Sequence, residues 1–476
     1  MMSKSKSVLQ GAPMIRLFRH YVPRALLLLA FVEALILVGS LYLGRSLRLY
    51  AYSMSQAELH NALPTALIFT TVMIVIMTAM GLYERHFWNG KADMILRVAV
   101  SFFLGLFVMT LIFYMLPDLY LGRGEFGQGF TLALAGVILV RFGFLHLSDR
   151  DILKRRVLVL GTGAKAAQIE HLPGDILRAI KIIGYVRLPA EESVVPPARI
   201  LPLTGTLYEL AEHYQIDEIL VTTDDRDNGL PIDEILECKI SGVYVVDLLM
   251  FFERETGKIR LDALQPSKLI FSDGFHQAVL KTTSKRLFDI LAALLLLAFT
   301  WPIMLLTALA IWIESKGHGP IFYLQERVGK NQRLFKVVKF RSMRTDAEQD
   351  GIARWAQAND SRITRVGSFI RKTRIDELPQ LFNVLWGHMS FVGPRPERPQ
   401  FVKELTHAIP FYSIRHRVNP GITGWAQICY PYGASEEDAC EKLQYDLYYI
   451  KNYSLFLDFM VLLQTAHVIL WGKGAR

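Results

Sequence analysis

Two adjacent carboxylates, Asp376 and Glu377, lie in the stretch of the chain that offers the most chemistry, residues 371–397. Basic residues surround them: from residue 327 to residue 374, Lys and Arg outnumber Asp and Glu by 13 to 4. A basic run is most often a solvated face or a contact with anionic lipid. Two carboxylates within such a run suggest instead a site for a polyanion and a divalent metal, because Mg²⁺ is usually held by one or two carboxylates together with substrate phosphates.

The local pattern predicts a helix that begins at Asp376. Pro379 is tolerated only in the first turn of a helix, and Gly387 is a typical helix stop, so the helix should run to Leu385 or Trp386. Asp376 would then lie at the helix N-terminus, where free N–H groups favour anions. A carboxylate in that place is either an N-cap or a nucleophile beside a phosphate site, and Asp is a common N-cap.

Five motifs follow one another in the C-terminal two-fifths of the chain. They are KRLFD at 285–289, GPIFYLQERVGKNQRLFKVVKFRSM at 319–343, the stretch at 371–397, PGITGWAQ at 420–427 and YDLYYIKNYSLFLDF at 445–459. Together they resemble the monotopic polyprenyl-phosphate sugar-1-phosphate transferases, which start exopolysaccharide and O-antigen assembly in bacteria. The apolar N-terminal segments and the α/β domain after them resemble the large members of that family. The stretch FERETGKIRLDALQPSKLIFSDGF is similar to the exopolysaccharide type.

The resemblance implies transfer of a sugar 1-phosphate from a UDP-sugar to a polyprenyl phosphate, with release of UMP. Asp376 would attack the β-phosphorus to give an aspartyl phospho-sugar ester, and the polyprenyl phosphate would resolve it. Mg²⁺ would lie at Asp376 and Glu377, and Glu377 would either hold the metal or assist the acceptor. We expect glucose or galactose as the sugar, and no nucleic-acid partner.

Other residues match family positions that would contact the substrates. Lys339 and Arg371 are expected at phosphates, with a strand-edge charge and a helix-surface residue as the respective structural alternatives. Arg395 lies between two prolines and is a candidate for the diphosphate, since Arg geometry suits phosphate oxygens. The remaining substrate-binding candidates are Arg341, Pro394, Pro396, Glu397, Gly421, Thr423 and Gln427. The last three would shape the nucleotide pocket, although glycines there could simply serve a turn.

The composition indicates a membrane protein with more than one domain. Of the 476 residues, 52% are hydrophobic, and the mean hydropathy is +0.27. The net charge of +9 allows either nucleic acid or an anionic membrane as partner, and the apolar segments favour the membrane. Three widely spaced cysteines argue against disulfides and zinc and fit a reducing compartment.

Four apolar segments, each near the ~20 residues that cross a bilayer, occupy residues 25–43, 63–82, 94–116 and 130–147. The basic N-terminal tail and the basic stretches at 84–97 and 150–156 predict that both ends of this unit face the cytoplasm. Glu33 and Arg141 are costly in lipid, so we expect them to pair inside the bundle, with a lipid-headgroup contact as the alternative.

Strands expected near residues 155–161, 182–186, 218–222 and 243–246 alternate with helical stretches, including one at 162–169. This alternation predicts a parallel, Rossmann-like sheet, followed by a connector at 251–275. GTGAKA at 161–166 resembles a dinucleotide fingerprint, but no acidic residue ends the second strand to hold a ribose. We therefore expect a regulatory or dimerising module, which leaves room for a homodimer.

A fifth apolar segment, residues 290–313, is long enough to span the bilayer but has basic residues on both flanks. Trp301 and Pro302 interrupt its middle. A spanning helix would separate Asp376 from cytosolic nucleotide sugars, and hydropathy alone leaves a kinked spanning helix open. The resemblance implies a re-entrant helix broken at Trp301 and Pro302. The apolar tail at 453–471 is expected along the membrane interface, or as a buried core helix.

The predicted fold is thus a membrane protein of the α plus α/β class. A four-helix transmembrane domain (1–150) and a Rossmann-like domain (151–275) precede a re-entrant helix with a helix-rich catalytic domain (276–476) on the cytoplasmic face of the inner membrane. Two other functions remain open at this point. A nicotinamide-dependent nucleotide-sugar enzyme would require an acidic ribose ligand and a Tyr-x-x-x-Lys pair. A non-enzymatic scaffold of polysaccharide export would leave the carboxylate pair among the arginines unexplained.

Overall fold

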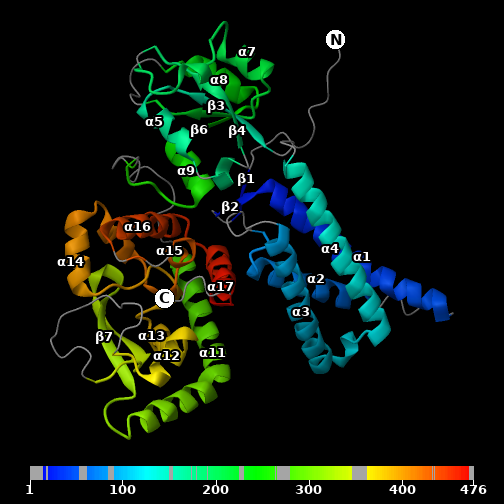
Figure 1. The fold of residues 1–476 in the computed structure, drawn as a ribbon, viewed down its shortest axis with the longest axis vertical. Helices are drawn as coiled ribbons and strands as arrows, with labels where there is room; N and C mark the ends of the chain where they lie inside the picture. Colours follow the sequence, from blue (N-terminus) through cyan, green and yellow to red (C-terminus); the bar gives the residue numbers. More distant parts are fainter. Residues whose placement is uncertain are drawn as a thin grey trace. The chain divides into compact units, whose positions relative to one another are not determined.

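The computed structural model (Figure 1) describes residues 14–17, 20–52, 62–83, 91–149, 154–172, 174–177, 180–189, 191–223, 230–262, 264, 279–345, 362–430, 433 and 435–470. These residues form two compact units. One lies within residues 1–256, and the other comprises His20 and the described residues from Gly257 onward. Of the basic stretches that predicted the orientation of the N-terminal helices, residues 1–13, 84–90 and 150–153 lie outside the described residues.

The predicted apolar segments are helices. After the short strands β1 (Met14–Leu17) and β2 (His20–Pro23) come α1 (Arg24–Tyr52), α2 (Ala62–Ala79), α3 (Lys91–Met115) and α4 (Arg123–Asp149). By length and composition, α1, α3 and α4 could each cross a membrane, as could α11 (Val279–Glu314), whereas α2 is shorter. Large apolar side chains such as Phe103, Phe107 and Leu139 are exposed on these helices, as expected for segments surrounded by lipid.

Glu33 and Arg141 form the predicted pair inside the bundle. Arg141 Nε lies 2.7 Å from Glu33 Oε1, and both side chains are fully buried. Arg141 also donates to the Leu82 carbonyl at 3.0 Å, and the Tyr83 hydroxyl donates to Glu33 at 2.5 Å. Each buried charge therefore has hydrogen-bonding partners, which is the condition under which an ion pair persists in an apolar interior.

The α/β domain contains a parallel sheet in the order β4-β3-β5-β6, as the alternation of strands and helices predicted. Its strands are β3 (Arg155–Leu160), β4 (Ile180–Val186), β5 (Glu218–Val221) and β6 (Tyr244–Asp247). The helices are α5 (Ala164–Ala167), α6 (Gly174–Leu177), α7 (Leu207–His213), α8 (Ile232–Ile240) and α9 (Leu248–Thr256). Side chains of α5 and α9 pack on one face of the sheet, and those of α7 and α8 on the other. The helix expected at 162–169 is shorter, because a 3₁₀ turn at Gln168–His171 follows α5 directly.

The first part of the predicted connector is wrong, because α9 extends through it to Thr256. Its charged residues are buried in an ion-pair network: Arg254 contacts Glu218 at 2.6 Å, and Arg155 contacts Glu255 at 2.6 Å and Glu218 at 2.8 Å. This charged segment is therefore part of the folded domain, because Arg254 and Glu255 each form an ion pair with a residue of the sheet. Of the remaining connector, residues 263 and 265–275 lie outside the described residues.

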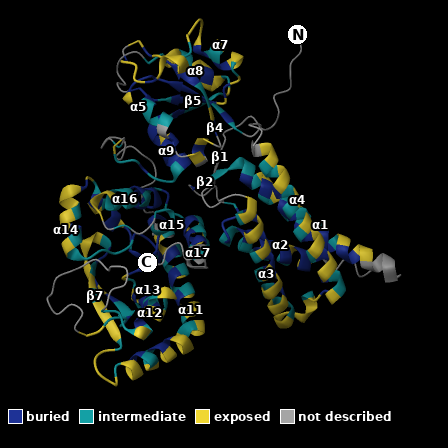
Figure 2. Cartoon of the chain, in the orientation of Figure 1, coloured by how far each residue is buried: buried dark blue, intermediate teal, exposed yellow. Residues whose placement is uncertain are grey.

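The longest helix of the second unit is α11, a single helix of 36 residues that changes direction along its length in Figure 1. The predicted break at Trp301 and Pro302 is thus not an interruption, since helical structure continues through both. Pro302 cannot donate a hydrogen bond within the helix, and such prolines bend helices without necessarily ending them. Figure 2 shows many exposed residues along α11, which include Phe299, Trp301 and Leu305.

The rest of this unit is mixed and helix-rich, as predicted. An antiparallel hairpin of β7 (Phe322–Val328) and β8 (Leu334–Phe340) precedes a parallel pair of β9 (Ser390–Val392) and β10 (Gly421–Thr423). The helices are α12 (Arg365–Lys372), α13 (Gln380–Trp386), α14 (Pro399–Ala408), α15 (Trp425–Cys429), α16 (Glu436–Lys451) and α17 (Leu455–Leu470). On α17, Leu457, Asp458 and Val461 are buried, while Leu455 and Phe459 are exposed. One face of this helix is therefore buried, as expected if the tail is a core helix.

Candidate active site

Asp376 and Glu377 lie on a 3₁₀ turn, η7 (Ile375–Glu377), and not on the α-helix predicted there. Arg374 enters the turn in the left-handed conformation with φ 60°. Because Pro379 has no N–H to give the Ile375 carbonyl, that carbonyl accepts from Leu378 at 3.1 Å, which keeps the turn tight. The α-helix begins only at Gln380, and Gly387 ends it at φ 84° as expected.

Three cations converge on Glu377. Lys339 Nζ lies 2.9 Å from Glu377 Oε1, Arg395 Nη2 lies 3.6 Å from the same oxygen, and Arg374 Nη1 lies 4.0 Å from it. Burial alone would raise the pKa of Glu377, but Lys339, Arg395 and Arg374 outweigh burial and lower this pKa to about 2. Glu377 is therefore ionised throughout the neutral pH range.

Asp376 has the opposite electrostatic environment. Its side chain is buried, and its Oδ1 accepts no hydrogen bond from any described residue. Burial, followed by the negative charge of Glu377, raises the pKa of Asp376 to about 6 against the opposing effects of Lys339, Arg374 and Arg371. Two neighbouring carboxylates thus have pKa values on opposite sides of the ordinary range, which is typical of sites where the two groups have different tasks.

Asn383, which the sequence patterns did not single out, bonds to the strand that carries Lys339. Its Oδ1 accepts from Val338 N at 2.9 Å, its Nδ2 donates to the Lys336 carbonyl at 2.7 Å, and the side chain is fully buried. These two bonds attach α13 to the backbone of β8 on either side of Val337. A lone Asn inside the apolar stretch LFNVLW was the available signal, because buried amides need hydrogen-bond partners.

The turn that carries Arg395 is fixed by its backbone. Arg415 donates to the Arg395 carbonyl at 3.0 Å and is itself paired with Asp446 at 2.9 Å. Gly421 N donates to the Pro394 carbonyl at 3.0 Å, so the PGITGWAQ motif contacts the turn directly. A Cβ on Gly421 would collide with the backbone of Gly393, which accounts for glycine at this close approach.

The other predicted substrate residues make structural contacts. Thr423 Oγ1 lies 2.7 Å from Thr465 Oγ1, and Gln427 Nε2 donates to the Ile422 carbonyl at 3.4 Å. Arg327 pairs with Glu397 at 3.5 Å and donates to the Pro396 carbonyl at 3.1 Å. Arg341 donates to the His318 carbonyl at 3.2 Å. Arg371 acts on Asp376 through its charge, which lowers the pKa of that carboxyl.

The KRLFD motif anchors α11 to this site. Lys285 Nζ contacts Asp458 at 2.7 Å and the Val392 carbonyl at 3.0 Å. Asp289 accepts from Ser390 Oγ at 3.0 Å and from Phe391 N at 3.1 Å. The motif therefore holds β9, the strand that leads into the Arg395 turn.

The residues present fit a sparse magnesium site. No cluster of three or more His, Cys, Asp or Glu side chains that could hold a metal ion occurs among the described residues. Mg²⁺ usually needs only one or two carboxylates when substrate phosphates complete its shell. The buried Oδ1 of Asp376, which accepts no hydrogen bond from a described residue, would supply such a ligand, whereas the ionised Glu377 already lies beside three cations.

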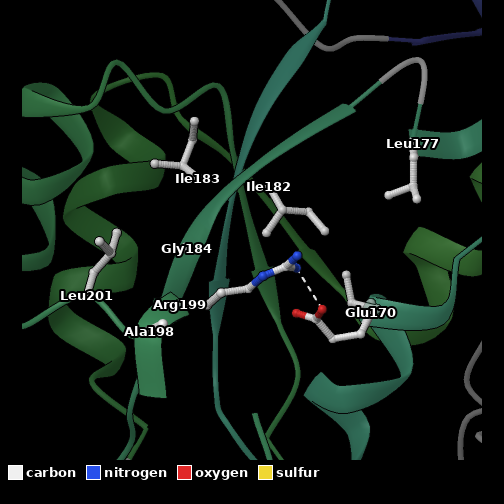
Figure 3. Close-up of a pocket in the computed structure, with 9 residues that line it drawn as sticks. Glu170, Leu177, Ile182, Ile183, Gly184, Ala198, Arg199 and Leu201 are labelled. Carbon is white, nitrogen blue, oxygen red and sulfur yellow. Dashed lines mark hydrogen bonds and ion pairs between the residues drawn. The ribbon is translucent and has the colours of Figure 1, made fainter. Parts of the chain in front are cut away.

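The glycine loop of the α/β domain is occupied by a carboxylate of the chain itself. Glu191 Oε2 accepts from Thr162 N at 2.9 Å, at the place where a dinucleotide phosphate would bind. This contact counts against the nicotinamide-dependent alternative. A cavity of about 470 Å³ lies beside β4 in the same domain, and Figure 3 shows the pair of Glu170 and Arg199 there, 2.6 Å apart.

Comparison with known proteins identifies the family. Residues 280–472 match the model of the bacterial sugar transferases. A UDP-N-acetylgalactosamine-undecaprenyl-phosphate N-acetylgalactosaminephosphotransferase of Aeromonas hydrophila is 44% identical over 54% of this chain and 60% of its own. An undecaprenyl-phosphate glucose phosphotransferase of Komagataeibacter xylinus is 35% identical over 68% and 60%. A UDP-glucose:undecaprenyl-phosphate glucose-1-phosphate transferase of Xanthomonas campestris pv. campestris is 32% identical over 87% of both chains.

The alignment with the Xanthomonas relative extends well beyond the matched C-terminal region, whereas this chain spans 60% of the length of the other two relatives. The motifs around Asp376 and Glu377 lie inside the region that the family model matches. The chain belongs to the bacterial sugar transferases, a family of polyprenyl-phosphate sugar-1-phosphate transferases.

Proposed function

We propose that this protein transfers a hexose 1-phosphate from a UDP-sugar to undecaprenyl phosphate and releases UMP, as the first membrane step of exopolysaccharide assembly. The observation that carries the proposal is the buried Asp376 Oδ1, which accepts no hydrogen bond from any described residue, next to a Glu377 that three cations keep ionised. A carboxylate oxygen that these residues leave without a hydrogen bond is available to react with an electrophile. The names of the relatives support the substrate classes.

In the first step, an Asp376 oxygen would form a bond to the β-phosphorus of the UDP-sugar. The bond from this phosphorus to the bridging oxygen would break, and UMP would leave with that electron pair. In the second step, an oxygen of undecaprenyl phosphate would attack the same phosphorus and release Asp376 as a carboxylate. The product would be an undecaprenyl-diphospho-sugar, so phosphoryl groups and charges balance over the two steps.

The cations around the pair would offset the charge that makes this reaction difficult. Two polyanions must approach a carboxylate, and phosphoryl transfer depends mainly on in-line positioning and electrostatic stabilisation. Lys339 and Arg395 border Glu377, and about a third of the Arg395 side chain is exposed, so it can reach a bound diphosphate. Arg371 would add positive charge near Asp376.

Mg²⁺ would be held by Asp376, with Glu377 as the second candidate, and by phosphate oxygens of the nucleotide. When bound, it would supply neutralisation of the developing charge on the leaving UMP.

Contacts at both ends of α11 support a re-entrant arrangement. Near its start, Arg286 donates to the Val384 carbonyl at 2.5 Å, and its last residue, Glu314, accepts from Val366 N at 3.2 Å. A straight helix between Arg286 and Glu314 would be about 42 Å long, more than the ~30 Å apolar core of a bilayer. Because both ends bind the same compact unit, a bent helix that enters and leaves one leaflet fits these contacts better than a spanning one.

This arrangement would place the catalytic unit on one face of the membrane. We assign it to the cytoplasmic face of the inner membrane, where nucleotide sugars are available. The sheet of the α/β domain is doubly wound with helices on both faces, and its second–first–third–fourth order occurs in doubly wound folds. We therefore describe it as Rossmann-like, with a regulatory or dimerising role.

The test is release of UMP by the full-length protein in detergent with Mg²⁺ and undecaprenyl phosphate. A panel of UDP-glucose, UDP-galactose and UDP-N-acetylgalactosamine decides the sugar, for which glucose or galactose is our proposal. Asp376→Asn should abolish release while Lys372→Gln, an exposed cation on the same segment, should retain it. Absence of UMP with every sugar of the panel would count against the proposed activity.

A further inference from the structure

Trp425 of the PGITGWAQ motif lies in a box of three partners. Its ring stacks on Tyr448 with centroids 5.9 Å apart, and the His20 ring meets it edge-on at 5.5 Å. Its indole N–H donates to the Gly257 carbonyl at 2.8 Å. His20 also hydrogen-bonds the Tyr448 hydroxyl through Nδ1 at 3.0 Å, so the box is closed on itself.

Two walls of this box come from outside residues 280–472, the region that matches the sugar transferase model. His20 is 428 positions away from Tyr448 and is the first residue of β2, ahead of the first apolar helix. Gly257 follows α9 and adopts φ 64°, with Trp425 so close that a Cβ would lie 3.0 Å from its ring. Two residues later, Ile259 N donates to the carbonyl of Gln444 on α16 at 3.0 Å.

The box is connected to β10 and β9, the two strands next to the turn of Arg395. Trp425 begins α15 one residue after β10, and β10 pairs with β9. Tyr449, the neighbour of Tyr448, donates to the Val392 carbonyl at the end of β9 at 3.0 Å. Both strands adjoin the turn of Arg395, through the bond from Gly421 N to the Pro394 carbonyl.

We propose that His20 is a positioning residue for sugar-phosphate transfer, which keeps Trp425 in place and thereby holds β10 against the turn that presents Arg395 to the substrate. The inference rests on the proposed function, because it assigns His20 a role in that same reaction. His20 is buried, and its role is packing and one hydrogen bond, without contact to the reacting atoms. The region at 280–472 alone would therefore lack part of the support of its own active site.

The test compares His20→Ala with His407→Ala in the full-length protein, since His407 is an exposed histidine of the same unit. For His20→Ala we expect kcat/KM for the UDP-sugar to fall about tenfold, the effect of losing a hydrogen bond and the alignment it maintains. Hydrogen exchange should become faster in peptides that cover 390–396 and 420–424 and stay unchanged in the 155–160 strand. Exchange that accelerates everywhere would indicate a merely structural role and overturn the proposal.

Tyr448→Phe decides the matter if His20→Ala does not fold, because it removes only the hydroxyl that bonds His20. It should weaken kcat/KM in the same direction, and Trp425→Phe combined with His20→Ala should be no worse than the more damaging single change. Wild-type kinetics and exchange in both His20→Ala and Tyr448→Phe would refute the role of His20. If the wild type released no UMP, the proposed function would fail, while the exchange measurement would still test the box.

Discussion

The pH dependence of the first half-reaction tests the environment of Asp376. With a pKa of about 6, Asp376 would be about nine-tenths ionised at pH 7, half ionised at pH 6 and about one-tenth ionised at pH 5. Because only the carboxylate attacks phosphorus, the rate of UMP formation should fall with an apparent pKa near 6 and then about tenfold per pH unit.

Arg374→Gln should shift the apparent pKa of this profile in a predictable direction. Arg374 lowers the pKa of Asp376, so its removal should move the acid limb upward. The Arg374 side chain is more than a third exposed, and comparable solvent-screened pairs contribute roughly 0.2–1 kcal/mol. The expected shift is therefore about half a pH unit. Lys372→Gln is the matched control, because Lys372 is exposed and is not among the main charges that shift the pKa of Asp376.

The assay is a single-turnover burst of UMP from UDP-sugar without undecaprenyl phosphate, measured from pH 4.5 to pH 8. Leaving out the acceptor removes the titration of its own phosphate from the profile. An acid limb below pH 5 in the wild type would refute the reasoning, as would a downward shift in Arg374→Gln.

Three further predictions concern stability. The folded pKa of Asp376 lies above its ordinary value of 3.8, so its contribution to stability is fully present below pH 4 and is lost as the pH rises through 6. Asp376→Asn should accordingly increase the free energy of unfolding at pH 8 by up to about 3 kcal/mol, which raises the thermal midpoint, and should leave both unchanged at pH 4. A lower thermal midpoint at pH 8 would contradict this. Asn383→Ala should lower the free energy of unfolding, measured with denaturant, by about 1–3 kcal/mol and should reduce kcat, because it leaves buried backbone groups unpaired. Gln400→Ala changes an exposed side chain and should alter neither quantity. Glu33→Leu should lower the free energy of unfolding in detergent by about 3–5 kcal/mol, and with it the thermal midpoint, because Arg141 is then buried without its partner. Adding Arg141→Leu should restore most of this stability, and a double variant less stable than Glu33→Leu would argue against the pair.

The sequence was sufficient for features that depend on composition and short-range pattern. Apolar length predicted the N-terminal helices, and the cost of charge in lipid predicted the pair of Glu33 and Arg141. Lys339 and Arg395 were predicted to contact substrate phosphates, and the structure places both beside Glu377.

Features that depend on an unusual backbone conformation or on contacts between distant segments were missed. The 3₁₀ turn of Asp376 depends on a left-handed Arg374, a conformation that a sequence pattern does not predict for Arg. The charged end of α9 resembles a solvated connector until Arg155 and Glu218 are placed beside it. His20 gave no signal at all, because its partners lie more than 400 residues away.

The most direct test of the central claim is the site of the covalent intermediate. Enzyme incubated with UDP-sugar labelled at the β-phosphorus, without acceptor, and quenched in acid should carry the label on the peptide that contains Asp376. Addition of undecaprenyl phosphate before the quench should remove it, and Asp376→Asn should never acquire it. Label on a different side chain, or a wild type that turns over without ever becoming labelled, would contradict the account.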